Sequence, residues 1–422
     1  MKRRTMLKGL AAGTVASGLG MPALAQGAKI KIGYVRPETG PLAGFTGADE
    51  FVLADFAATA SQMGLDVEII TRDSQSSPAR AGDVAAELIV DEEVSMMIVG
   101  AAPETNNPVA TICESEGIPC ISTLSPWQPY FIGRQANPAD PTSWKPFDYG
   151  FHFFWGLEDV VSTFTKMWQT LDTNKKVGFL FANDADGLAW ADPNNGLPPV
   201  MNDLGFDIVD LGRHKVLNDD FTNFVNAFKR EEVEIVTGTM IPPDFITFWN
   251  QAQQQGFKPK MATVGKGLLY PQDVAAIGPA AHNLSCEVWW APSFPYSSSL
   301  NGQSAADYAA AFTETTGRPW TQVMGFIHAL LEVAVDAIKR ADDPTDPDAL
   351  AEALAVTNLD TIVGNVAWPG ASAPPFAAPN VTRTPVVGGQ WRVQDDGGVE
   401  LVIVENTDHP NIPKGGEIEA LN

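Results

Sequence analysis

The chain has 422 residues, with 51 Asp and Glu against 27 Lys and Arg and a formal net charge of −24 at pH 7. This acidic balance argues against nucleic acid or an anionic membrane surface as a partner. The length exceeds one ordinary hydrophobic core, so we expect two lobes.

The first 25 residues have the features of an export signal. Arg3 and Arg4 precede a weakly apolar stretch, and small residues at 23 and 25 suit cleavage after Ala25. The stretch is too short and too rich in glycine to span a bilayer stably. The paired arginines favour a twin-arginine signal, with Met6 in place of the usual Phe, and a general secretory signal is the alternative. We therefore predict a soluble protein that is exported to a bacterial periplasm.

Strand and helix patterns alternate in the first part of the mature chain. Apolar runs predict strands at 29–35, 65–73, 94–100 and 118–123, with helices between them at 48–64, 77–93 and 106–117. An irregular segment rich in proline and aromatic residues follows at 125–150. Continuous apolar strands that alternate with helices predict a parallel sheet covered on both faces.

The same alternation restarts after residue 156. It predicts strands at 175–183, 206–212, 233–240 and 260–265, and helices at 157–171, 196–205, 219–232 and 243–256. A third part adds two helices, at 304–317 and 322–341, and a β-hairpin at 384–406. The sequence therefore predicts an α/β fold with two doubly wound lobes and parallel-sheet cores.

The loops after the predicted strands are the expected ligand-binding positions. In open parallel sheets a ligand lies outside the carboxyl ends of the strands. These loops hold glycines, hydroxyl groups, an aromatic residue and a few charges, at 36–47, 100–107, 122–127, 182–187, 239–244 and 265–267. Because the loops of two lobes converge, we expect a cleft between the lobes.

The sequence gives little support for catalysis or metal binding. The five histidines are scattered, and Cys113, Cys120 and Cys286 form no zinc spacing. A nucleophile-elbow motif is absent, and a polar loop explains the acid pair Asp184 and Asp186 better than acid–base chemistry does. We therefore predict a binding protein with no catalytic residue, no metal and no cofactor. A Cys113–Cys120 disulfide would join a helix to the next strand, and this alternative stays open.

Five stretches carry a likeness to a known family: KIGYVRPETGPLAGFTG, MMIVGAAPETNNPVATICESEGIP, FWNQAQQQGFKPKMATVG, FIHALLEVAVDAI and LDTIVGNVAW. The chain resembles the periplasmic binding proteins of ABC importers, in particular the leucine/isoleucine/valine-binding group. The likeness covers essentially the whole mature chain. It implies lobe 1 at 28–156 and 291–362 and lobe 2 at 157–290 and 363–422, joined by three crossovers.

The resemblance also implies a function. A monomer would close its lobes on a small organic solute and then dock to an ABC permease in the inner membrane. The solute would be a carboxylate or amino-acid-like, and an aromatic or hydrophobic body is one expectation. A ligand-sensing protein that reports to a membrane receptor would have the same fold and cleft, so this function remains the alternative.

Carried over residue by residue, the resemblance implies a binding site in the cleft. In lobe 1 its members are Phe45, Glu104, Thr105, Leu124, Ser125 and Trp127. Phe45 would lie over the ligand side chain, and free N–H groups at a helix start beside Thr105 would favour an anion. The alternatives are a core position for Phe45 and a plain N-cap for Thr105.

In lobe 2 the implied members are Asp184, Asp186, Met240, Ile241, Lys266 and Gly267, and the returning helix adds His328. The family often has a tyrosine before a glycine in the loop that holds the two aspartates, and here that tyrosine is absent. A histidine on an apolar helix is more often a satisfied core residue, which is the alternative for His328. Aromatic residues near these positions favour a hydrophobic solute: Phe45, Trp127, Tyr130, Trp144, Phe151, Phe153, Phe154 and Trp155.

Lys266 is the clearest departure from the family pattern. Amino-acid binders of the family commonly have a carboxylate there, which pairs with the ammonium group of the ligand. In one interpretation the ligand has no ammonium group and Lys266 holds its carboxylate. In the second, Lys266 pairs with Glu104 across the cleft, and in the third it is a solvated loop residue. The departure favours a carboxylate ligand that lacks an ammonium group.

Overall fold

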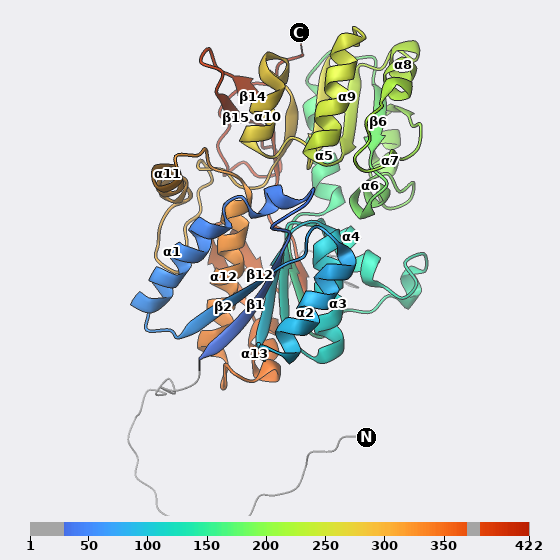
Figure 1. Cartoon of the computed structure of the whole chain (residues 1–422). Coiled ribbons are helices and arrows are strands. Elements are labelled where there is room, and N and C mark those ends of the chain that lie inside the picture. The colour runs from blue at the N-terminus through green and yellow to red at the C-terminus, as the bar shows by residue number, and fades with distance from the viewer. Residues whose placement is uncertain (1–28, 369–379, 422) are drawn as a thin grey trace, which may run out of the picture.

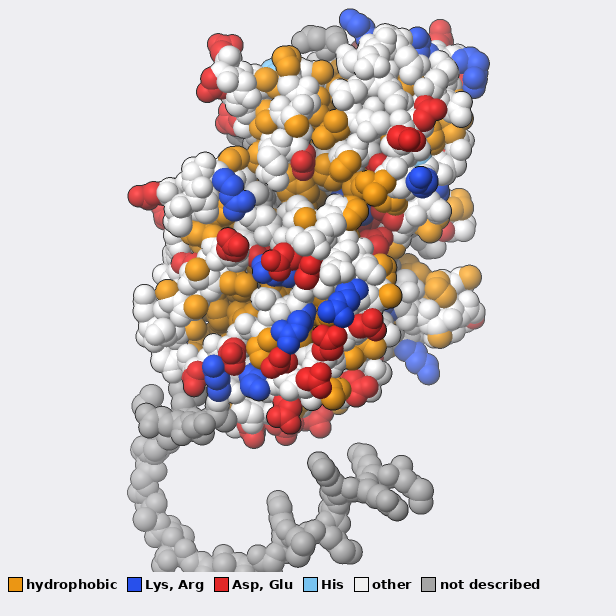
Figure 2. All heavy atoms as spheres, viewed as in Figure 1, with side chains coloured by type: hydrophobic (Ala, Val, Ile, Leu, Met, Phe, Trp, Pro, Cys, Tyr) orange, Lys and Arg blue, Asp and Glu red, His pale blue; other side chains and the backbone are white. Residues whose placement is uncertain are grey.

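The computed structural model describes residues 29–368 and 380–421, so the predicted signal at 1–25 lies outside the described residues. Two β-sheets form the cores of two lobes that are stacked one above the other (Figure 1). We call the part around the first sheet lobe 1 and the part around the second sheet lobe 2. Acidic side chains are spread over the visible face of both lobes, with Lys and Arg among them (Figure 2).

The sheet of lobe 1 has six strands in the order β13-β5-β4-β3-β1-β2, and every neighbouring pair is parallel. The strands are β1 (Ile30–Arg36), β2 (Val67–Asp73), β3 (Met96–Gly100), β4 (Cys120–Thr123), β5 (Gly150–Phe153) and β13 (Val381–Thr382). A parallel sheet of this kind confirms the predicted fold class for lobe 1. Strand β5 begins at Gly150, the last residue of the segment that we predicted to be irregular, and the sequence predicted no strand there.

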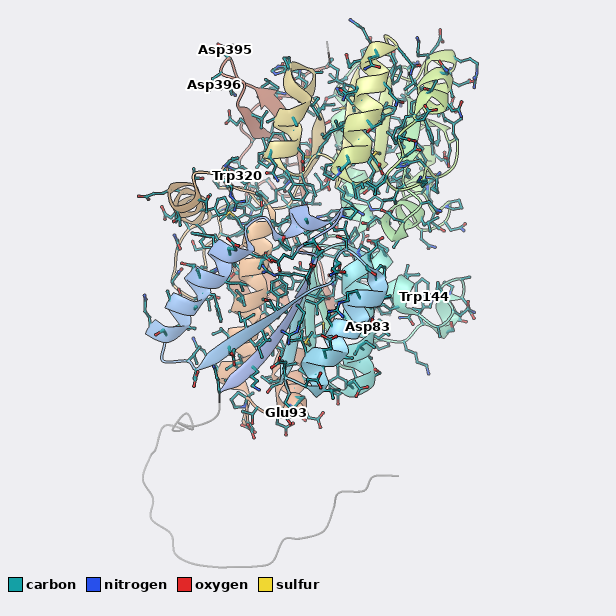
Figure 3. The ribbon with its side chains drawn as sticks, viewed as in Figure 1. Asp83, Glu93, Trp144, Trp320, Asp395 and Asp396 are labelled. Carbon is teal, nitrogen blue, oxygen red and sulfur yellow. The ribbon has the colours of Figure 1, made fainter. Side chains whose placement is uncertain are left out.

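The sheet of lobe 2 has seven strands in the order β15-β14-β10-β9-β8-β6-β7. They are β6 (Lys176–Phe181), β7 (Asp207–Val209), β8 (Ile235–Thr239), β9 (Met261–Gly265), β10 (Ser285–Val288), β14 (Val387–Val393) and β15 (Val399–Glu405). The first five are parallel, whereas β14 and β15 form the predicted antiparallel hairpin. Asp395 and Asp396 lie at the tip of this hairpin (Figure 3).

Both faces of the lobe 1 sheet are buried, as its apolar strands predicted. Successive residues of a strand point to opposite faces. Met96 and Ile98 of β3 belong to the large core that includes helices α1 (Asp49–Gln62) and α12 (Val323–Arg340). Met97 and Val99 belong to the separate core under helices α2 (Pro78–Val90) and α3 (Pro103–Glu116). A strand with apolar residues at every position is therefore stabilised on both sides.

The remaining helices surround the sheets and connect the strands. They are α4 (Trp127–Phe131), α5 (Leu157–Gln169), α6 (Ala185–Trp190), α7 (Pro198–Asp203), α8 (Thr222–Arg230), α9 (Pro242–Gln254), α10 (Pro271–Ile277), α11 (Ala305–Thr316) and α13 (Pro347–Ala355). Four 3-10 turns, η1 (Ala43–Thr46), η2 (Ile132–Arg134), η3 (Pro141–Ser143) and η4 (Gly278–Ala281), complete the elements, and β11 (Asn358–Thr361) pairs with β12 (Gly364–Ala367). None of the helices in the described part of the chain is long and apolar enough to cross a membrane.

The chain passes between the lobes three times: after β5, after β10 and after β13. We expected the last passage at residue 363, but Val381 and Thr382 still pair with β5 of lobe 1. A strand of two residues has no periodicity in the sequence, which explains the difference. Cys113, Cys120 and Cys286 are all buried free thiols, so the structure contains no Cys113–Cys120 disulfide.

Candidate functional site

A small cavity of about 30 Å³ lies between the lobes, at the carboxyl ends of strands from both sheets. Lobe 1 lines it with Phe45, Leu124, Pro126, Phe154 and Trp155, and lobe 2 with Asp186, Trp190, Thr239, Lys266, Leu269, Glu287 and Trp289. We call it the interlobe cavity. An adjoining outer groove of about 220 Å³ shares Phe45 and Lys266 and is also lined by Ile241, Tyr270 and Asp273.

A larger cavity of about 770 Å³ lies elsewhere, among the segments that cross between the lobes. Its lining includes Asp159, Tyr296, Arg383 and His409 and none of the predicted site residues. Strands of both sheets end at the interlobe cavity, which is where open parallel sheets bind ligands. It is therefore the better candidate site despite its smaller volume.

The turn after β9 places Lys266 inside the interlobe cavity. Its backbone has a φ of 60°, a left-handed conformation that costs a non-glycine residue about 1–3 kcal/mol. Gly265 lets the turn approach its neighbours, because a Cβ there would lie 2.9 Å from the Trp190 ring. The N–H of Lys266 donates to Glu287 Oε1 at 3.3 Å, and the N–H of Gly267 donates to the Gly265 carbonyl at 2.6 Å. The two glycines therefore serve a tight turn that buries the lysine.

Lys266 forms ion pairs with two aspartates of its own lobe. Its Nζ lies 2.5 Å from Asp186 Oδ2 and 3.2 Å from Asp184 Oδ2. Asp184 is held in place as the N-cap of α6, where Oδ1 accepts from the Gly187 N–H at 2.7 Å. Lys266 is only 5% exposed, so it is not a solvated loop residue. The sequence predicted neither partner for it.

Burial and charge together set the protonation of this cluster. Burial lowers the pKa of Lys266, but Asp184, Asp186 and Glu104 outweigh this and raise that pKa well above its usual value. Burial raises the pKa of Asp186 to about 7 even though Lys266 opposes the rise, and Glu104 and Asp184 add to it. Burial also raises the pKa of Glu287 to about 8. The cluster thus holds a charged lysine beside two carboxyl groups, Asp186 and Glu287, whose raised pKa makes them take up a proton more readily than usual.

Several polar atoms of the cluster have no hydrogen-bond partner among the described residues. They are the carboxylate oxygens Glu104 Oε2, Asp186 Oδ1 and Glu287 Oε2 and the indole N–H groups of Trp155, Trp190 and Trp289. Five of these atoms belong to residues that line the interlobe cavity, and the sixth belongs to Glu104 outside its lining. Buried polar groups are normally paired, so the five atoms indicate a binding site for a polar group.

Aromatic rings form the apolar wall of the interlobe cavity. Trp155 meets Trp190 edge to face at a centroid distance of 5.9 Å, and Phe154 meets Trp289 at 5.5 Å. These pairs join residues of the two lobes or of the passages between them. The wall suits a ligand with an aromatic or aliphatic body.

The lobe 1 residues Glu104 and Thr105 lie in the first turn of α3. Glu104 Oε1 accepts from the N–H of Ala185 at 3.2 Å, which is a hydrogen bond between the lobes. Glu104 therefore bonds to the backbone of α6, whereas Lys266 forms its ion pairs with Asp184 and Asp186. Thr105 is fully buried and its Oγ1 has no partner among the described residues. The N-cap of α3 is Ala102, so Thr105 is not the plain N-cap that was the alternative.

The residues after β4 divide between the site and the core. Leu124, with a φ of 65°, lines the interlobe cavity, and Phe45 lines both this cavity and the outer groove. Ser125 is buried, and its carbonyl contacts His152 Nε2 at 2.8 Å. The indole N–H of Trp127 donates to Glu158 at 3.0 Å, and its ring packs in the core under α2 and α3. Trp127 therefore lies outside the two cavities.

Of three further predicted residues, one lines the outer groove and two are buried away from both cavities. Ile241 lines the outer groove, whereas Met240 is buried in the core beside it. His328 Nε2 lies 2.7 Å from Ser298 Oγ, and burial lowers the pKa of this histidine to about 4. His328 lines neither cavity, which matches its alternative as a satisfied core residue.

Most of the aromatic residues noted in the sequence are not part of the wall. Phe45, Phe154 and Trp155 line the interlobe cavity. Trp144 lies on the segment between α4 and β5, beside lobe 1 (Figure 3), where it packs against Phe131 at 6.2 Å. The remaining four pack in the cores: Trp127, Tyr130, Phe151 and Phe153.

Sequence reasoning did not name six residues that line the cavity. Pro126 and Thr239 lie in loops that were expected to bind a ligand, whereas four lie outside those loops: Trp190, Leu269, Glu287 and Trp289. Glu287 had a detectable signal, because it is a single charge inside the apolar run around β10, and it is only 2% exposed. The others carry no local signal, since tryptophan and leucine are common in cores.

The comparisons with known proteins agree with this fold. The family model described as periplasmic binding protein matches residues 29–376. A leucine-binding protein, LivK, from Thermotoga maritima is similar in structure, with a TM-score of 0.70 and 19% identity over 90% of this chain and 99% of that chain. The substrate-binding protein LivJ from Streptococcus pneumoniae, solved with isoleucine, gives a TM-score of 0.70 and 16% identity over 90% and 100% of the two chains.

A third structure extends the range of ligands among similar folds. A solute-binding protein of an ABC transporter from R. palustris, solved with 4-hydroxybenzoate, gives a TM-score of 0.69 and 16% identity, covering 90% of this chain and 96% of that chain. At these identities the likeness to solved structures shows the fold. The family match covers most of the chain.

Proposed function

The chain belongs to the periplasmic binding protein family, and we propose that it is the solute-binding component of an ABC importer. It captures a small organic solute by closure of its two lobes and delivers it to a membrane permease. The observation that carries this proposal is the interlobe cavity, whose lining comes from the strand ends of both lobes. Closure on a ligand selects one conformation, which a permease then distinguishes from the open one.

The sequence predicted a carboxylate or amino-acid-like solute with an aromatic or hydrophobic body, and this proposal requires only a small organic solute with such a body. The ring pairs of Trp155, Trp190, Phe154 and Trp289 support the apolar body. The unpartnered N–H groups and carboxylate oxygens of the cavity support polar ends of both kinds. The protein acts as a binding protein without enzymatic activity, in the periplasm and as a monomer.

Mass spectrometry of the compound that co-purifies with the exported protein tests this function. The expected result is a stoichiometric small organic solute, whose removal lowers the melting temperature and whose return restores it. X-ray scattering should show a smaller radius of gyration with the solute than without it. A protein that carries no solute and neither closes nor gains stability with any amino acid, aromatic carboxylate or amine would contradict the proposal.

A further inference from the structure

We infer, on the premise that the proposed solute-binding function holds, that the interlobe cavity selects an organic cation with N–H donors and does not require a carboxylate on it. The class includes primary amines, amidines and guanidines on an aromatic or aliphatic body. The geometry also assigns Lys266 a specific role: its ammonium group occupies the place of the ligand cation, and the ligand displaces it.

The charges around the cavity favour a cation. Lys266 is the one cation in the described lining, and four carboxyl groups surround it: Glu104, Asp184, Asp186 and Glu287. Two of these, Asp186 and Glu287, are 4% and 2% exposed and line the cavity. A ligand carboxylate would meet these acids and a lysine whose charge is already paired, which is unfavourable in a buried site.

The unpartnered oxygens indicate hydrogen-bond donors on the ligand. Asp186 Oδ1 and Glu287 Oε2 accept no hydrogen bond from any described residue, and both belong to side chains that are more than nine-tenths buried. Glu104 Oε2 adds a third such oxygen from the opposite lobe. A primary ammonium, amidinium or guanidinium carries several N–H donors and a positive charge, so one group satisfies oxygens from both lobes.

The ammonium group of Lys266 already pairs with two of these carboxyl groups. Its Nζ lies 2.5 Å from Asp186 and 3.2 Å from Asp184, as the nitrogen of a bound amine would. The lysine stem has four rotatable carbons, and Lys266 also borders the outer groove, which Asp273 lines. The side chain can therefore swing from the interlobe cavity into the groove when a ligand cation takes its partners.

The aromatic wall adds a second attraction for a cation. Trp155, Trp190 and Trp289 line the same cavity as Asp186 and Glu287. Indole faces attract ammonium and guanidinium groups, most strongly in desolvated sites. The tryptophan rings of the wall and the carboxyl groups thus both favour a positively charged ligand.

Titration calorimetry with matched probes tests the inference. The probes are phenethylamine, benzamidine, phenylalanine and 3-phenylpropionate, measured at pH 7.5 on solute-free protein. We expect phenethylamine or benzamidine to bind more tightly than 3-phenylpropionate. We expect Lys266→Met to tighten amine binding by at least about tenfold, because it removes the competing cation, and Glu287→Gln or Asp186→Asn to weaken it by at least about tenfold.

The controls separate charge from folding. Lys258→Met removes an exposed lysine outside the cavity and should leave all affinities unchanged. Lys266→Gln repeats the test if Lys266→Met does not fold. Tighter binding of 3-phenylpropionate, lost in Lys266→Met, would overturn the inference and leave the proposed function intact. Failure of every probe, together with no co-purifying solute, would instead overturn the proposed function.

Discussion

Glu287 shows how one residue of β10 affects both stability and binding. Its carboxyl group lies under the turn that holds Lys266 and accepts the Lys266 N–H at 3.3 Å. Burial raises its pKa to about 8, from an ordinary value of 4.5. A carboxyl group with a raised pKa binds a proton more tightly in the folded state, so its burial costs stability once it ionises.

Glu287→Gln should therefore change how stability depends on pH. In the wild type, the contribution of Glu287 is fully present below pH 4.5 and is lost as the pH rises to about 8. The variant lacks this titration, so its stability relative to wild type should rise between pH 5 and pH 8.5. Urea unfolding at both pH values measures the difference. Parallel behaviour of the two proteins would show that burial does not perturb Glu287.

Gly44 of lobe 1 lies against Tyr270 of lobe 2, and both residues line the outer groove. A Cβ on Gly44 would lie 2.7 Å from Cε2 of Tyr270, closer than side chains pack. Gly44→Ala should therefore oppose closure and weaken solute binding by about tenfold, with little change in the unfolding of solute-free protein. Gly47→Ala is the matched control, because a Cβ there makes only ordinary contacts. Equal affinities of the two variants would contradict this role.

At the scale of elements, α12 anchors a segment that enters lobe 1 after β10 and the β11–β12 turn that precedes the last passage. Glu332 accepts hydrogen bonds from the N–H and hydroxyl of Ser299 and from the N–H of Ile362 at 3.0 Å. One turn earlier on the helix, His328 contacts Ser298. Because Glu332, His328 and Ser298 are buried, the helix holds the second passage where it reaches lobe 1.

Glu332→Ala should destabilise the protein by about 1–3 kcal/mol, since it leaves the buried N–H of Ile362 without an acceptor. Chemical unfolding of solute-free protein measures the loss. Glu352→Ala, an exposed change on α13, serves as the control and should lie within about 0.5 kcal/mol of wild type. A loss for Glu332→Ala no larger than that of the control would show that α12 does not anchor this segment.

At the scale of the whole molecule, transport requires export before the lobes can capture a solute. We propose that the protein is a twin-arginine substrate cleaved after Ala25, so the periplasmic form should begin at Gln26. N-terminal sequencing of the periplasmic fraction tests the cleavage site. Replacement of Arg3 and Arg4 by lysine should abolish export through this route, and unchanged export would favour the general secretory route.

The sequence predicted the elements with strong periodicity and missed those without it. The apolar runs of β3 and β8 and the long helix α12 were clear, because burial of a whole strand or helix face constrains many residues. The sequence missed the strands β5, β10, β11, β12 and β13 and the helices α4, α6, α10 and α13. Their few residues carry little pattern, and their positions depend on tertiary packing.

The sequence also predicted only part of the candidate site. Loops after parallel strands pointed to Phe45, Leu124, Asp186 and Lys266, which all line the interlobe cavity. Trp127 and His328 were assigned to the site, but they are buried outside the cavity. Trp127 follows a strand end, where an aromatic residue can face either side, and His328 lies within the apolar helix α12, where a histidine is more often a core residue.

The sequence by itself determined the α/β class, the two parallel-sheet cores and the acidic surface, because hydrophobic periodicity and net charge are local or additive properties. Only the tertiary structure decided the partners of Lys266. Asp184 is 82 positions away along the chain, and it reaches Lys266 because β9, β8 and β6 are neighbours in the sheet. Strand order is not encoded in local periodicity. The structure therefore changed Lys266 from an expected carboxylate binder into a paired cation within an acidic cavity.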